Sequence, residues 1–213
     1  MPSISDAYST TALYKTAFSL TANTQDTRID SVLIAVSRYI DRRCGRFFGI
    51  DAAVVERIYS PSGRRLSLDG RPAFMVNDIA TKTGLVIKQD DDLDGSVADE
   101  TAWTIETDFL VWPEQADKGP EAAPWRAIVI PTWSAKSFLA EARLSVTAKF
   151  GWAAVPTAIA QGTLEIAGIV MTDSPRATSR IQEGVDAAIA ASPEAQSIVL
   201  ALVDTYGHGL AFS

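Results

Sequence analysis

The fold is decided at residues 38–48, which read Arg-Tyr-Ile-Asp-Arg-Arg-Cys-Gly-Arg-Phe-Phe. Glycine ends helices readily because it adopts the left-handed conformation, so Gly45 predicts the end of a helix over residues 26–44. Apolar residues upstream recur every three or four positions, as one helix face requires. They are Ile29, Leu33, Val36 and Ile40. The pattern predicts an amphipathic helix whose apolar stripe packs on a core.

A second stretch, residues 150–156, reads Phe-Gly-Trp-Ala-Ala-Val-Pro and leads from a predicted strand into a helix over residues 157–171. Proline suits the first turn of that helix, because its missing N–H would be unpaired there anyway. The helix is apolar on almost every side, so we expect it to be buried by its own chain or by neighbours. Its narrow polar strip consists of Gln161 and Glu165. Gly162 and Gly168 lower the helix propensity, and we expect another backbone to pack closely against them.

A third core helix is predicted over residues 193–206. Ser192 is a favoured N-cap residue, and Gly207 is positioned to end the helix. Between the second and third helices, residues 173–183 are mostly polar and contain Pro175. This segment predicts a connector without helical structure.

Between the first two helices, residues 53–150 predict strands and turns. The strands are expected at residues 54–59, 66–68, 84–88, 103–105, 109–112, 127–130 and 144–148, separated by Gly-, Pro- and Asp-rich turns. The sequence therefore predicts an α+β fold in which a helical core carries an inserted, mostly antiparallel β lobe. We expect residues 1–213 to form a single domain, with residues 53–150 as the lobe within it.

The composition is that of a globular protein with 47% hydrophobic and 21% charged residues among 213. No apolar run approaches the roughly 20 residues that a membrane-spanning helix needs, so no membrane contact is expected. One cysteine cannot form an internal disulfide. The net charge of −7 argues against sequence-independent DNA binding, which relies on lysine and arginine, but an acidic wall suits DNA that passes without sticking.

The usual catalytic residue types offer no credible site. His208 is the only histidine and follows the helix-ending Gly207, which favours a terminal residue over a general base. Cys44 lies in the last turn of an amphipathic helix and is expected to be a small core residue. We therefore expect no catalytic residue, no cofactor and no enzymatic activity. An enzyme of unknown type remains the weakest alternative.

One acidic loop resembles a metal site. Residues 90–95 read Asp-Asp-Asp-Leu-Asp-Gly, and their alternate carboxylates match the start of an EF-hand calcium loop. The match fails at the twelfth position, which is Thr101 where a bidentate Glu is needed. We expect a solvated acidic hairpin without a metal. The alternative function is a calcium-dependent β-sheet binding module that uses this loop.

Two features of the first core helix suggest a subunit interface. Ile34 is predicted on the face opposite the apolar stripe, where it is either a harmless exposed residue or a subunit contact. Arginines cluster at the end of this helix, either to complement its dipole or to form salt bridges with another subunit. The interface residues predicted are Ile34, Arg38, Arg42 and Arg46.

The order and spacing of four segments carry a family resemblance. They are residues 38–48, residues 150–156, Ser174-Pro175-Arg176, and the last helix from Ser192 to Gly207. Together they resemble the head–tail connector, or adaptor, proteins of tailed bacteriophages. The resemblance covers most of the chain but not the detail of residues 60–140.

The resemblance implies a structural protein of the virion that is assembled in the host cytoplasm. Family members form a ring, usually twelve-fold, beneath the portal protein. The ring extends the channel through which genomic DNA passes and provides a platform for the next neck or tail protein. Connector C-terminal regions commonly engage the portal, so the resemblance implies a portal-docking role for Leu210 and Phe212.

Overall fold

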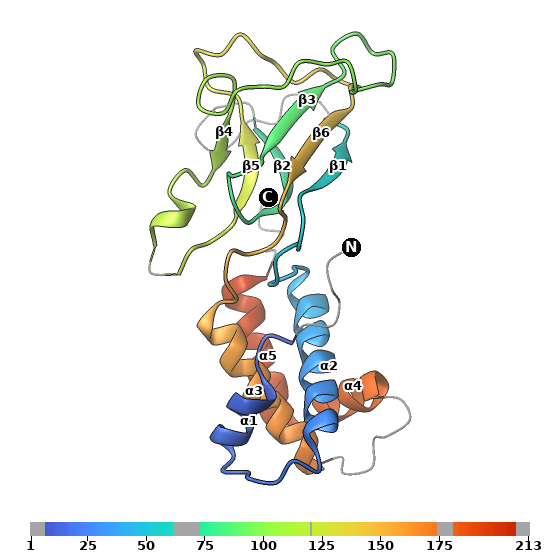
Figure 1. Cartoon of the computed structure of the whole chain (residues 1–213), viewed down its shortest axis with the longest axis vertical. Coiled ribbons are helices and arrows are strands. Elements are labelled where there is room, and N and C mark those ends of the chain that lie inside the picture. Colours follow the sequence, from blue (N-terminus) through green and yellow to red (C-terminus); the bar gives the residue numbers. More distant parts are fainter. Residues whose placement is uncertain (1–6, 62–72, 120, 174–180, 208–213) are drawn as a thin grey trace. The chain divides into compact units, whose positions relative to one another are not determined.

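A computed structural model describes residues 7–61, 73–119, 121–173 and 181–207 of the chain (Figure 1). These residues divide into two compact units. The described residues up to Gly49 and from Val155 onward form a helical unit, and Ile50–Ala154 form a unit of strands. The fold is α+β, as predicted, with helices and antiparallel sheets in separate units.

The helical unit contains the three core helices that the sequence predicts. Its elements are α1 (Thr11–Ala17), α2 (Asp26–Cys44), α3 (Thr157–Asp173), α4 (Ile181–Ala191) and α5 (Pro193–Tyr206). Gly45 ends α2 in the left-handed conformation with a φ of 64°, as predicted from its residue type. The Ser192 hydroxyl accepts a hydrogen bond from the Ala195 N–H and caps α5. The start and stop signals in the sequence therefore locate α2 and α5 correctly.

Helix α3 is buried mainly by its own chain. It packs against α2, α4 and α5, and its polar strip at Gln161 and Glu165 is exposed. Side chains pack against Gly162 and Gly168, whereas we expected another backbone to approach them. A Cβ on Gly162 would lie 2.8 Å from the Leu202 Cδ1, and one on Gly168 would lie 2.3 Å from the Phe18 ring.

Helix α4 corrects the prediction of a polar connector over residues 173–183, because the helix begins at Ile181. Val185 and Ile189 are buried, and the Gln182 amide donates a hydrogen bond to the Ala35 carbonyl oxygen of α2. Among the described residues, no single helix is long and apolar enough to cross a membrane. The adjoining helices Gln182–Ala191 and Pro193–Tyr206 reach that length and composition only together, across a 99° bend.

The strand unit contains two three-stranded antiparallel sheets. One has the order β1 (Val55–Tyr59), β6 (Leu144–Ala148), β3 (Val86–Gln89). The other has the order β2 (Ala73–Ile79), β5 (Trp125–Val129), β4 (Leu110–Trp112), and a short 3₁₀ helix, η1 (Ala116–Lys118), follows β4. Their buried faces share one apolar core, which includes the fully buried Phe109, Ile128 and Leu144.

Two details of the strand unit differ from the sequence prediction, and one prediction lies outside the described residues. Residues 103–105 form no continuous strand, only isolated bridges of Trp103 with Ile87 and of Ile105 with Phe109. The turn that follows is held in part by the Asp108 carboxylate, which accepts a hydrogen bond from the Thr104 N–H. Strand β2 was not predicted, and an irregularity between Met75 and Ile79 interrupts its register with β5. The strand predicted at residues 66–68 falls outside the described part of the chain.

Candidate interaction surfaces

Cys44 is a core residue, as the sequence predicts. Its side chain is buried, and burial raises the pKa of its thiol to about 11, so the reactive thiolate is scarce at neutral pH. His208 lies outside the described residues.

The acidic loop is organised by its own backbone. Asp90 is buried, and its carboxylate accepts hydrogen bonds from the N–H groups of Asp94 at 3.1 Å and Gly95 at 2.9 Å. The Asp92 carboxylate accepts a further bond from Asp94 N–H at 3.2 Å. Carboxylate oxygens of Asp90, Asp92 and Asp94 lie within 4.8 Å of one another. These hydrogen bonds account for the carboxylate positions as parts of a tight loop, and the burial of Asp90 differs from the solvated hairpin expected from the sequence.

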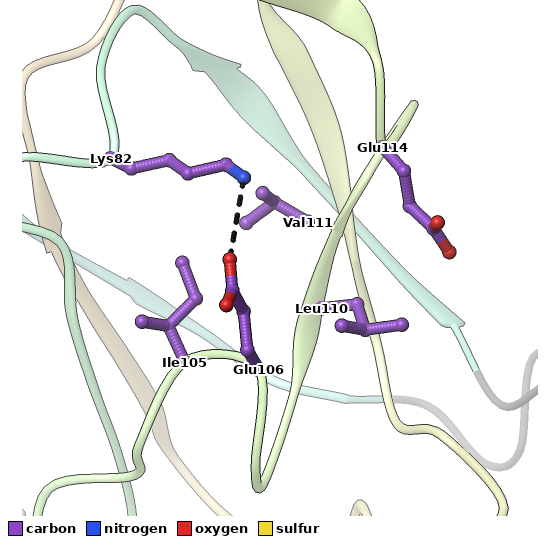
Figure 2. A pocket seen from close by; sticks show the side chains of 6 residues that line it. All are labelled: Lys82, Ile105, Glu106, Leu110, Val111 and Glu114. Atoms are coloured by element: carbon purple, nitrogen blue, oxygen red, sulfur yellow. Dashed lines mark ion pairs between the residues drawn. The ribbon is translucent and has the colours of Figure 1, made fainter.

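An open pocket with a volume of about 310 Å³ lies beside β4 in the strand unit (Figure 2). Figure 2 shows the Lys82 ammonium pointing at the Glu106 carboxylate, with Ile105 and Val111 beside them and Glu114 directed away. The Lys82 Nζ and Glu106 Oε1 atoms are 3.9 Å apart, and both side chains are solvent-accessible. The lining has no histidine, cysteine or hydroxyl group that could act as a nucleophile.

The four residues predicted for a subunit interface all lie in the helical unit, but three already have partners there. The Arg38 guanidinium lies 5.1 Å from the ring centres of both Tyr8 and Phe47, and its Nε is 3.2 Å from the Asp41 carboxylate. Only 16% of the Arg38 side chain is exposed. Arg38 therefore contributes to packing of its own chain.

Arg42 and Arg46 connect α2 to the C-terminal helices. Arg42 pairs with Asp186 of α4 at 2.8 Å, with both side chains about half exposed. Arg46 donates a hydrogen bond to the Tyr206 carbonyl oxygen at the end of α5. Ile34 is half-buried rather than fully exposed, which differs from its expected position. Whether these residues also contact another subunit stays a prediction.

A buried network around Tyr8 was not predicted. The Tyr8 hydroxyl donates a hydrogen bond to the Asp41 carboxylate at 2.5 Å and accepts one from the Phe48 N–H at 2.9 Å. Burial, reinforced by the Asp41 carboxylate, raises the pKa of Tyr8 well above its ordinary value. Burial also raises the pKa of Asp41, although its hydrogen bond from Tyr8 and the charge of Arg38 oppose that shift. The network fixes the segment before α1 to the end of α2.

Several large apolar side chains are exposed and could contact other proteins. The most exposed are Leu13 of α1, Leu93 of the acidic loop, Trp133 of the segment after β5, and Leu200 of α5. Tryptophan and leucine at such positions bury substantial apolar area when a partner covers them. The residues predicted for portal docking, Leu210 and Phe212, lie outside the described part of the chain.

Two solved structures are similar to this chain in fold. One is a chain from the neck of an empty gene transfer agent particle computed with C6 symmetry, with a TM-score of 0.53 at 15% sequence identity. The match covers 92% of this chain and 88% of that one. The other comes from the virion of a native gene transfer agent particle, with a TM-score of 0.49 at 16% identity and the same coverage. Neither a protein-family model nor a curated protein matches the sequence.

Proposed function

We propose that this chain is a structural neck protein of a phage-like particle, specifically a head–tail connector. The observation that carries the proposal is the fold similarity to the neck chain of the gene transfer agent particle, over 92% of this chain. The resemblance of residues 38–48 and 150–156 to head–tail connector proteins supports the same role.

In this role the chain forms a ring, twelve-fold by the family resemblance, beneath the portal protein. The ring extends the DNA channel and carries the next neck or tail protein. Its net charge of −7 suits passage of genomic DNA without binding, since acidic surfaces repel phosphates. The protein acts without catalysis, is assembled in the host cytoplasm and resides in the virion. Leu210 and Phe212 dock on the portal.

The proposal is tested by mixing the purified chain with portal-bearing, DNA-filled heads that lack their necks. We expect the chain to co-sediment with these heads, and electron microscopy to show an added ring at the portal vertex. Heads without portal serve as the control. Failure to bind the portal-bearing heads, or equal binding to both kinds of head, would refute the connector role.

A further inference from the structure

One buried side chain joins two loops of the strand unit. Gln89, the last residue of β3, is only 2% exposed. Its amide nitrogen donates hydrogen bonds to the Asp91 carboxylate at 2.9 Å and to the Ser137 carbonyl oxygen at 3.0 Å. Its amide oxygen accepts a hydrogen bond from the Leu139 N–H at 3.2 Å. Gln89 therefore holds the acidic loop against the loop after β5 (residues 131–143), at the end of the unit where β3 ends and β6 begins (Figure 1).

Further contacts fix these two loops to each other and to the core. The Arg143 guanidinium donates a hydrogen bond to the Gly95 carbonyl oxygen. The Lys136 Nζ lies 3.9 Å from the Asp91 carboxylate. Phe138 is buried in the apolar core of the strand unit and anchors the loop after β5. Both loops therefore hold their shape without help from another molecule.

Each loop presents a large apolar side chain to solvent. Trp133 is 65% exposed and Leu93 is 56% exposed. Leu93 also has a φ of 63°, in the left-handed region that leucine rarely adopts. Tryptophan is enriched among the residues that dominate binding energy in protein interfaces, and a preformed loop loses little entropy on binding. We call the exposed part of the two loops, with Trp133 and Leu93, the loop surface.

The loop surface is strongly acidic. Residues 90–100 contain six acidic residues and no lysine or arginine. The loop after β5 adds two bases and one acid, and both of its bases already contact the acidic loop. Such a surface repels the phosphates of nucleic acid and attracts a basic protein surface. The exposed carboxylates are those of Asp91, Asp92, Asp94, Asp99 and Glu141.

We propose that the loop surface binds the next neck or tail protein of the particle, at a site that combines basic side chains with an apolar recess for Trp133 and Leu93. The proposal rests on the neck function proposed above and names the surface that carries the downstream protein. Charge complementarity selects a basic partner, and the two exposed side chains supply apolar area to bury. A second copy of this chain is a poorer match, because its net charge is −7.

Tail joining tests this proposal. Portal-bearing heads are saturated with wild-type or variant chain, purified tails that carry the remaining neck proteins are added, and joined particles are counted by electron microscopy. Trp133→Ala and Leu93→Ser should each raise the tail concentration for half-maximal joining by about tenfold or more, since a buried apolar contact is lost. Both should bind heads and unfold as the wild type does, because both side chains are exposed. Trp112→Ala and Leu13→Ser, at other exposed positions, are matched controls that should join tails normally.

Salt dependence provides a second measurement. Joining to the wild-type chain should weaken as the NaCl concentration rises, because salt screens the attraction between the acidic loops and a basic partner. The variant Asp99→Asn/Glu141→Gln should join tails less well at low salt and should depend less on the salt concentration. Glu183→Gln, at an exposed acid of α4, is the matched control and should leave both unchanged. Joining of wild-type particles that does not respond to salt would contradict a basic partner.

Photo-cross-linking identifies what contacts the loop surface. A benzoylphenylalanine at position 133 is irradiated in joined particles, and the products are identified by mass spectrometry. We expect a cross-link to a neck or tail protein, at a segment that contains lysine or arginine. A cross-link only to a second copy of this chain, to the portal or to DNA would overturn the proposal.

The outcomes separate this inference from the neck function. If heads bind the chain and join tails equally well with the wild type and with Trp133→Ala/Leu93→Ser, this inference is wrong and the neck function stands. If the wild-type chain does not bind portal-bearing heads, the neck function itself is wrong, and this inference is wrong with it.

Discussion

At the scale of residues, Tyr8 holds the segment before α1 against the end of α2 through its hydroxyl group. Its hydroxyl bonds both the Asp41 carboxylate and the Phe48 N–H, over 33 and 40 positions of sequence. Tyr8→Phe leaves these two groups without their partner while keeping the ring. We expect it to lower the free energy of unfolding by about 1.5–3 kcal/mol, as measured by urea denaturation.

Tyr59→Phe is the matched control, because the Tyr59 hydroxyl bonds Asn77 at an exposed site and should contribute less to stability.

The raised pKa of Tyr8 also makes the stability of the protein depend on pH. Its contribution to stability is fully present below the ordinary tyrosine pKa of 10.0 and is lost as the pH rises above it, because the unfolded chain ionises first. Tyr8→Phe should therefore reduce the loss of stability above that pH. An equal loss in both proteins would contradict this assignment.

Substitution of Asp90 tests whether the acidic loop is structural or binds calcium. Its buried carboxylate accepts bonds from two N–H groups of the loop, which an amide can satisfy only in part. Asp90→Asn should lower the free energy of unfolding by about 1–3 kcal/mol, equally with calcium and with a chelator. The exposed Asp92→Asn variant should change stability less. Calorimetry that shows micromolar calcium binding dependent on Asp90 would establish the calcium-module alternative instead.

At the scale of elements, Gly168 of α3 leaves space for Phe18, which follows α1, to pack against the helix. The Phe18 ring packs where a Gly168 side chain would be, although Phe18 itself is 43% exposed. Gly168→Ala should therefore destabilise the protein by about 1–3 kcal/mol through overpacking. In a Phe18→Ala background the same change should become neutral or stabilising, because alanine favours the helix by about 1 kcal/mol.

A double-mutant cycle on thermal or urea unfolding measures this coupling. Gly162→Ala is the matched control, since its nearest side-chain contact is Leu202 and its effect should not depend on Phe18. If Gly168→Ala changes the free energy of unfolding equally with and without Phe18, the packing of the Phe18 ring does not require a glycine at position 168.

The elements that were predicted well are those with strong local signals. Ser192 and Gly207 bracket α5, and Gly45 ends α2, because capping is a property of adjacent residues. Helix α4 was missed, although Val185, Ala188 and Ile189 have helical spacing, because its short sequence has no clear cap and contains Gly184. The whole of strand β2 was also missed, and its pairing with β5 is irregular between Met75 and Ile79.

The candidate sites depended on contacts that the sequence does not encode locally. The sequence showed the arginine cluster of α2, but the position of the Arg38 guanidinium over the Tyr8 and Phe47 rings arises from tertiary packing. Likewise, the exposure of Leu200 follows from how α5 lies in the bundle, since its stripe at Val199 and Leu202 is the buried side. Periodicity indicates which helix face is apolar, but not which remaining residues stay accessible for another protein.

At the scale of the whole molecule, the C-terminal segment is expected to connect the subunit to its neighbour in the particle. Leu210 and Phe212 follow the capped helix α5 and alternate as an added strand would require. Deleting residues 208–213 should leave the unfolding transition unchanged but weaken attachment to portal-bearing heads by about tenfold or more, since two apolar side chains lose their burial. A Gly/Ser tail of equal length controls for chain length, and Leu210→Ser/Phe212→Ser should match the deletion. Unchanged affinity of the deletion variant for the heads, measured by quantitative co-sedimentation, would place portal docking elsewhere on the chain, with the exposed Leu13 and Leu200 as the next residues to substitute.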